Sequence, residues 1–240
     1  MKKLLGVSFI FQLTVVAVFL IGCSKNTAIT TTEATPGPSS GSGYTYLALG
    51  DSYTIGQNVQ EKERFPYIVA DLLRQQSIPV KDPKYIAKTG WSTIALQEEI
   101  KNAEPLGTFD IVTLLIGVND QYQGLDTAGY RLRFTQLLTK AVQLAGNKKH
   151  RVFVLSIPDY GATPFGASNK ERIGKEIDAF NKINKEVTTM SAISYIDITP
   201  LTRLAETDRS LLANDGLHYS AKEHRLWASE LVPLVKDALK

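Results

Sequence analysis

Short apolar runs alternate with longer amphipathic segments along most of this chain, and that alternation limits the folds it can adopt. The runs are rich in β-branched or aromatic residues, as expected of parallel strands covered on both faces. Strand–helix alternation favours a parallel sheet with helices on both sides. The expected fold is a three-layer α/β/α domain around a parallel sheet of about five strands. The expected strands are residues 44–49, 85–87, 111–116, 152–157 and 193–198.

Three helical segments carry an apolar stripe that should face the sheet. In the last segment, Ser220 and Glu223 match a capping box that would fix the preceding loop. His224 follows them, and we expect it at the surface, with His150 solvated. The stripes are Phe134, Leu137, Leu138, Ala141, Val142 and Ala145, then Ile173, Ile177, Phe180, Asn184 and Val187, then Trp227, Leu231, Leu234, Val235 and Ala238.

Three positions come just after expected strands: Ser52 after the first, Gly90 after the second and Asn119 after the third. Taken singly, a turn serine, a loop glycine and a turn asparagine are the ordinary explanations. Ligands of open parallel sheets bind outside the carboxyl ends of the strands. These three distant segments should therefore converge on one edge, and that convergence points to a site.

Asp215 and His218 supply the groups that a serine nucleophile needs. A hydroxyl becomes reactive when a base removes its proton, and an imidazole base works best when a carboxylate fixes its tautomer. Ser52 would be the nucleophile, His218 the general base and Asp215 the orienting group. The Gly-x-Ser-x-Gly elbow is absent around Ser52, so the α/β-hydrolase fold is not supported.

Four ordered segments together resemble the blocks of the SGNH (GDSL-type) hydrolase superfamily. They are Gly50-Asp51-Ser52, the lone Gly90, Gly117-Val118-Asn119-Asp120 and Asp215-Gly216-Leu217-His218. The resemblance covers nearly all of the chain after residue 44. It implies a flavodoxin-like α/β/α fold and a serine esterase that works through an acyl-enzyme.

The resemblance also implies an oxyanion hole. Its donors would be the backbone N–H groups of Ser52 and Gly90 and the side-chain amide of Asn119. A glycine suits this use because no Cβ keeps the substrate from its backbone. Asp51 and Asp120 also match the blocks, and we expect them to hydrogen-bond nearby loops rather than to transfer protons.

One residue departs from the resemblance. Tyr219 follows His218 where many members have proline. Proline restricts its own backbone and that of the residue before it, so this change should alter the stiffness of the loop more than its chemistry.

The ester substrate is constrained less closely. We expect short-chain acyl or O-acetyl esters, because the candidate rim residues are aromatic or small and no apolar segment outside the expected strands and helices offers a lipid-binding lid. The alternatives are a lysophospholipase or thioesterase acting on longer chains, a catalytically silent binding lipoprotein, and a flavodoxin-like nucleotide binder, although no phosphate loop is present. The candidate rim residues are Tyr53, Trp91, Tyr122, Tyr160, Gly161 and Gly166.

The N-terminal residues 1–22 have the features of an export signal. Lys2 and Lys3 precede an apolar stretch that ends in Leu20-Ile21-Gly22-Cys23. The stretch is long enough for a membrane-spanning anchor, but its end resembles the bacterial lipobox, in which the cysteine becomes a lipidated N-terminus. We expect residues 1–22 to be a lipoprotein signal peptide, Cys23 to be lipidated, and Ser24 to indicate an outer-membrane location in the cell envelope.

Residues 23–43 should form a flexible tether, because they are rich in Ser, Thr, Gly and Pro. Residues 44–240 fit one domain. The chain has 27 basic and 24 acidic residues, and loss of Lys2 and Lys3 would leave a net charge of 25 − 24 = +1. With no basic stripe, nucleic acid is not an expected partner. The expected partners are a small-molecule, glycan or lipid ester and the membrane, with no metal or cofactor.

Overall fold

The computed structural model describes residues 43–240, and the expected signal peptide and Cys23 lie outside this range. Five strands form one sheet in the order β2-β1-β3-β4-β5, and every neighbouring pair is parallel. Strands β1, β3 and β4 are buried along their whole length, which explains their continuous apolar sequence. The strands are β1 (Tyr46–Gly50), β2 (Lys84–Ala87), β3 (Ile111–Leu115), β4 (Val152–Leu155) and β5 (Ser194–Ile196).

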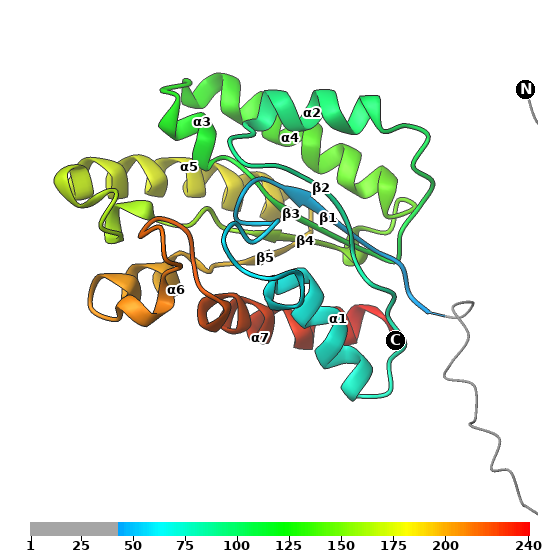
Figure 1. Ribbon diagram of the computed structural model, residues 1–240. Coiled ribbons are helices and arrows are strands. Elements are labelled where there is room, and N and C mark those ends of the chain that lie inside the picture. Colours follow the sequence, from blue (N-terminus) through cyan, green and yellow to red (C-terminus); the bar gives the residue numbers. More distant parts are fainter. Residues whose placement is uncertain (1–42) are drawn as a thin grey trace, which may run out of the picture. The chain divides into compact units, whose positions relative to one another are not determined.

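Helices cover both faces of the sheet, which confirms the expected three-layer α/β/α fold (Figure 1). Helices α1 and α7 pack together on one face, and α2, α4 and α5 lie on the other. The helices are α1 (Phe65–Gln75), α2 (Thr93–Asn102), α3 (Val118–Tyr122), α4 (Thr127–Leu144), α5 (Lys170–Met190), α6 (Thr199–Arg203) and α7 (Ala221–Ala238).

The strand order places the switch point of the sheet between β1 and β3. From β1 the chain first goes outward to β2, then returns to β3 and continues the other way to β4 and β5. In flavodoxin-like sheets ligands bind outside the carboxyl ends of the strands at this point. Ser52 follows β1 and Asn119 follows β3, so these two residues flank the switch point.

Gly50 lets β1 end close against its neighbour. A Cβ at this position would overlap the carbonyl oxygen of Leu115 and the hydroxyl of Thr54. Only glycine therefore allows the chain to turn from β1 into the Ser52 segment without displacing β3.

The predicted capping box of α7 is wrong. Ser220 occupies the N-cap position, but its hydroxyl donates to the carbonyl of Ser210 at 2.8 Å. The Glu223 side chain is fully buried and accepts a hydrogen bond from Trp227 Nε1 at 2.7 Å. The indole one turn further along the helix takes the carboxylate that a capping box would use.

Two other expectations for α7 are also wrong. His224 is 1% exposed rather than at the surface, and its Nδ1 accepts a hydrogen bond from the Phe65 N–H of α1. Leu234 is 40% exposed, because the buried stripe follows the four-residue spacing of Trp227, Leu231 and Val235. The His224 imidazole is buried because α1 packs against α7.

The two ends of the domain meet. The hydroxyl of Tyr44 donates to the carbonyl of Leu239 at 3.2 Å, which joins the segment before β1 to the end of α7. Within residues 43–240, no helix combines the length and apolar character needed to cross a membrane. The same residues contain no cluster of three or more His, Cys, Asp or Glu side chains arranged to hold a metal ion.

Candidate active site

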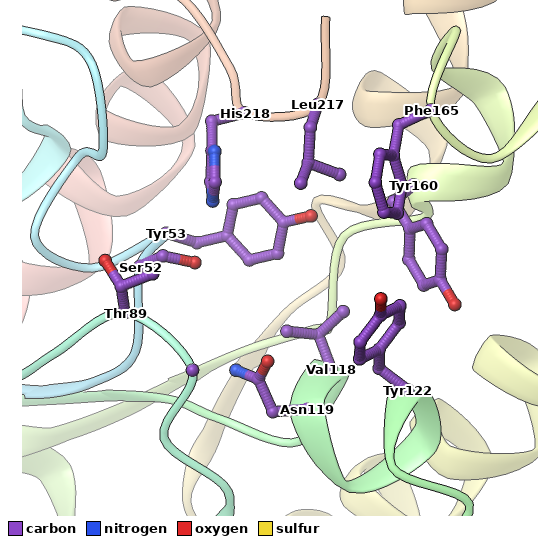
Figure 2. Close-up of a pocket in the computed structure, with 11 residues that line it drawn as sticks. Ser52, Tyr53, Thr89, Val118, Asn119, Tyr122, Tyr160, Phe165, Leu217 and His218 are labelled. Atoms are coloured by element: carbon purple, nitrogen blue, oxygen red, sulfur yellow. The ribbon is translucent and has the colours of Figure 1, made fainter. Parts of the chain in front are cut away.

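A cavity of about 180 Å³ opens at the carboxyl edge of the sheet (Figure 2). Four residues predicted from the sequence line it, namely Ser52, Gly90, Asn119 and His218. The structure thus brings together groups from the segments after β1, β2 and β3 and from the loop before α7. The remaining lining residues are Tyr53, Thr89, Val118, Tyr122, Tyr160, Phe165 and Leu217.

Ser52 lies in a tight turn whose backbone is held by Asp51. The Asp51 carbonyl accepts hydrogen bonds from the N–H groups of Thr54 and Ile55, and its Oδ1 accepts from the Tyr53 N–H at 3.0 Å. Burial raises the pKa of the Asp51 carboxyl to about 8. Asp51 therefore supports its own turn, as expected from the sequence, and is largely neutral at pH 7.

His218 and Asp215 form a hydrogen-bonded pair. His218 Nδ1 lies 2.6 Å from Asp215 Oδ2, while Asp215 Oδ1 accepts the backbone N–H groups of Leu217 and His218 at 3.0 and 2.9 Å. Partial burial acts to raise the pKa of Asp215, but the hydrogen bonds from the His218 ring and these N–H groups outweigh it and lower the pKa. The ionised carboxylate favours a proton on Nδ1 and leaves Nε2 as the acceptor.

The His218 ring is directed toward Ser52 (Figure 2). Among residues 43–240 no hydrogen bond joins the Ser52 hydroxyl to this ring, although both groups face the same cavity. Catalytic hydrogen bonds are often long in the absence of substrate and tighten when it binds. The arrangement suits transfer of the serine proton to Nε2.

An aromatic wall backs the imidazole. The Tyr53 ring lies 5.6 Å from both the His218 and the Tyr219 rings, between centroids. Tyr219 is fully buried, and its hydroxyl donates to the Asp159 carbonyl at 3.2 Å. Burial lowers the pKa of His224, behind this wall, to about 3, so that imidazole is neutral. Tyr219 thus holds the loop of the base through packing and a hydrogen bond.

The opposite side of the cavity carries the predicted oxyanion donors. Gly90 has a φ of +83°, a conformation that strains other residues. Asn119 Nδ2 donates to the Trp91 carbonyl at 3.0 Å, and an amide nitrogen has a second hydrogen to offer. The Asp120 carboxylate accepts the Thr93 N–H at 2.7 Å, which ties the start of α2 to α3. These contacts fix the Gly90 loop beside Asn119.

The rim prediction is correct in part. Tyr53, Tyr122 and Tyr160 line the cavity, but Trp91, Gly161 and Gly166 do not. The backbone carbonyl of Trp91 instead accepts the hydrogen bond from the Asn119 side chain. The two glycines are buried in the loop after β4, where a Cβ on Gly166 would overlap the Tyr160 carbonyl. They shape that loop rather than contact a substrate.

Asn58 is a residue of this site that the sequence analysis missed. It has a φ of +67°, which asparagine tolerates better than most residues. Its Nδ2 donates to Asp215 Oδ2 at 2.5 Å. An asparagine shortly after Ser52 is a sequence signal for a left-handed turn. Nothing in the local sequence identifies Asp215, 157 residues away, as its partner.

Comparison with protein families decides the identity of the fold and of its chemistry. Residues 48–226 match the GDSL-like Lipase/Acylhydrolase family. The chain belongs to this family. It is an ester hydrolase, and each of the four sequence blocks that suggested the family contributes at least one residue to the lining of the cavity. Comparison with curated proteins gives no match.

Several solved structures share the fold. A lipase/acylhydrolase from Enterococcus faecalis superposes with a TM-score of 0.65 at 18% identity, covering 81% of this chain and 96% of that chain. An acetylxylan esterase from Geobacillus stearothermophilus gives 0.63 at 16% identity, with coverages of 81% and 95%. A psychrotrophic esterase from Pseudoalteromonas sp. gives 0.59 at 18% identity, with coverages of 82% and 98%.

Proposed function

We propose that the protein is a serine esterase that hydrolyses short-chain acyl esters, O-acetyl esters among them, with Ser52 as nucleophile. The supporting observation is that Ser52, the His218–Asp215 pair and the Gly90 and Asn119 donors surround one small cavity. A binding protein would need no such combination of a hydroxyl, an oriented imidazole and convergent donors.

The reaction has two halves. The Ser52 oxygen attacks the ester carbonyl while His218 Nε2 takes its proton, and the resulting oxyanion accepts hydrogen bonds from Gly90 and Asn119. As the C–O bond breaks, His218 returns the proton to the leaving alcohol. Water then attacks the acyl-enzyme with the same base, which releases the carboxylic acid and restores Ser52. Asp215 keeps Nδ1 protonated and stabilises the imidazolium.

The size and walls of the cavity favour a short acyl group. Its volume of about 180 Å³ is below the ~300–1,000 Å³ of pockets that bury drug-sized ligands. Only Val118 and Leu217 among the lining residues are aliphatic, and the other large side chains are aromatic. A long alkyl chain needs a continuous aliphatic wall, which these residues do not provide.

The second candidate is a lysophospholipase or thioesterase activity on longer chains. One observation favours it: Tyr122 and Phe165 are 60% and 53% exposed, so the mouth of the cavity offers apolar surface on which a chain could lie. Comparing kcat/KM for p-nitrophenyl acetate, butyrate and decanoate tests the choice. We expect the acetyl and butyryl esters to be preferred, and a clear preference for decanoate would favour the longer-chain activity.

We also propose that Cys23 anchors the protein to a membrane of the bacterial cell envelope, with Ser24 favouring the outer membrane. The lipobox-like Leu20-Ile21-Gly22-Cys23 supports this location. Labelled palmitate should become attached to Cys23 of the wild-type chain, and the wild-type protein should be found in the membrane fraction. If a Cys23→Ser variant still incorporates the label, the anchor lies elsewhere.

A further inference from the structure

The ring of Tyr53 is held rigidly beside the proposed catalytic groups. It is 3% exposed and contacts three aromatic rings, with centroid separations of 5.6 Å to His218, 5.6 Å to Tyr219 and 6.5 Å to Trp227. A ring enclosed in this way cannot turn to find a partner for its hydroxyl. The position of the hydroxyl is therefore fixed by the fold.

The hydroxyl of Tyr53 points into the cavity, away from Ser52 (Figure 2). Within residues 43–240 it has no hydrogen-bond partner. The three tyrosines that are at most 1% exposed each have one, as buried hydroxyls normally do. Their partners are Thr113 for Tyr46, Asn184 for Tyr130 and Asp159 for Tyr219.

We propose that the Tyr53 hydroxyl is a specificity-determining group that hydrogen-bonds a hydroxyl on the alcohol side of the ester, so that the favoured substrates are acetyl esters of sugars. This rests on the proposed esterase function. An acetyl group has only one polar atom besides the ester oxygen, its carbonyl oxygen, and Gly90 and Asn119 face that atom. The hydroxyl of Tyr53 is then left for the alcohol.

The outer part of the cavity suits a sugar ring as well. The rings of Tyr122, Tyr160 and Phe165 form a triangle with centroid separations of 6.1, 6.2 and 6.3 Å. Aromatic side chains combine apolar faces with polar tips, and the faces can pack against the C–H groups of a pyranose. A sugar therefore finds apolar ring faces beside the hydroxyls of Tyr53, Tyr122 and Tyr160, whereas an alkyl chain would cover the Tyr53 hydroxyl without pairing it.

The test uses two acetyl esters whose alcohols are six-membered rings of different polarity. Methyl xyloside carrying one acetyl group presents ring hydroxyls, and cyclohexyl acetate presents a ring of the same size without them. The measured quantity is the ratio of kcat/KM for the sugar ester to kcat/KM for cyclohexyl acetate. We expect the wild-type ratio to exceed one.

Tyr53→Phe removes one oxygen and keeps the aromatic contacts. It should lower the ratio roughly tenfold to a hundredfold, the usual effect of leaving a substrate hydroxyl without its partner. Tyr67→Phe on α1, outside the cavity, is the matched control and should keep the wild-type ratio. The pH profile of kcat/KM should be the same in wild type and Tyr53→Phe, because the ring still packs on His218.

Two results would overturn the inference. A ratio that is unchanged in Tyr53→Phe would show that the Tyr53 hydroxyl does not hydrogen-bond the alcohol part of the substrate. A shifted pH profile with equal losses on both substrates would show that Tyr53 acts on His218 instead. Hydrolysis of cyclohexyl acetate and labelling of Ser52 by a fluorophosphonate report the esterase itself, so failure of the proposed function is seen separately.

Discussion

Asn58 and Asp215 are joined by a hydrogen bond of 2.5 Å from the asparagine amide to Oδ2, the same oxygen that lies 2.6 Å from His218 Nδ1. The loop after Ser52 thus restrains the carboxylate that orients the imidazole. The backbone N–H groups of Leu217 and His218 hold the other oxygen. The orienting group is fixed from both sides of the site.

Loss of the Asn58 amide should weaken catalysis without removing it. Asn58→Ala should lower kcat/KM roughly threefold to tenfold, since one hydrogen bond to a charged group is lost but the Asp215–His218 pair stays. Asn58→Asp should cost more, because a second carboxylate beside Asp215 raises the pKa of that group. Both are measured from the pH profile of kcat/KM on p-nitrophenyl acetate.

Asn147 provides the control for backbone strain at position 58. It is exposed, has a φ of +62° and lies beyond the end of α4. Asn147→Ala carries the same conformational cost and should leave kcat/KM at the wild-type value. Equal losses in Asn147→Ala and Asn58→Ala would mean that stability, not the contact with Asp215, explains the result.

The nucleophile can be identified by covalent labelling. A fluorophosphonate should react with Ser52, because the neighbouring imidazole activates that hydroxyl. Ser52→Ala should fold with a wild-type circular dichroism spectrum and lose the label. Ser229→Ala, at an exposed serine of α7, should still be labelled. A labelled Ser52→Ala protein would contradict the assignment.

Asn119 should act mainly in the transition state. Asn119→Ala should lower kcat roughly a hundredfold to a thousandfold with a smaller change in KM, because its donor matters most when charge develops on the carbonyl oxygen. Steady-state kinetics on p-nitrophenyl acetate gives both constants.

Gln123 separates that effect from simple support of the loop. Its Nε2 donates to the Gly90 carbonyl at 3.3 Å, as Asn119 Nδ2 donates to the Trp91 carbonyl. Gln123→Ala should lower kcat by much less than Asn119→Ala. Similar losses of kcat in the two variants would show that Asn119 only supports the Gly90 loop.

The buried carboxyl of Glu223 should make stability depend on pH. Burial raises its pKa to about 7, so between about pH 4.5 and 7 the folded state holds a proton that the unfolded state has lost. The free energy of unfolding therefore falls as pH rises through this range. Glu223→Gln copies the protonated form, and it should match the wild type near pH 4.5 and exceed it at pH 8 by at most about 3 kcal/mol.

Urea unfolding at pH 4.5, 6.5 and 8 measures this difference. The contributions of Asp51 and His224 are present in both proteins and cancel in the comparison. Glu230→Gln, at an exposed position of the same helix, is the control and should follow the wild type at each pH. A constant gap between the wild type and Glu223→Gln would show that the carboxyl does not titrate in this range.

The sequence was sufficient for the sheet and for the main lining of the site. The expected strands at 85–87 and 111–116 lie within one residue of β2 and β3. For β3 the reason is its complete burial, since a parallel strand buried on both faces is apolar along its length. Ser52, Gly90 and Asn119 reach one edge because parallel strands all end on the same side. These features follow from local patterns and from topology.

Contacts between distant side chains were not predictable in this way. The sequence Ser220-Ala221-Lys222-Glu223 fits a capping box equally well whether or not Trp227 takes the carboxylate, and only the packing decides. His224 became a core residue because α1 lies over α7. The direction of the Tyr53 hydroxyl likewise depends on three rings supplied by the last part of the chain.

The hydrogen bond between Tyr44 and Leu239 holds the two ends of the domain side by side. A short peptide could join the ends of the domain, and new ends could be opened at the exposed Gly146–Asn147 bond, beyond α4. In such a circular permutant Asp215 and His218 would precede Ser52 in the chain. The order of the three residues along the chain depends only on how the segments are connected. Their positions at the carboxyl edge of the sheet bring them together in either order.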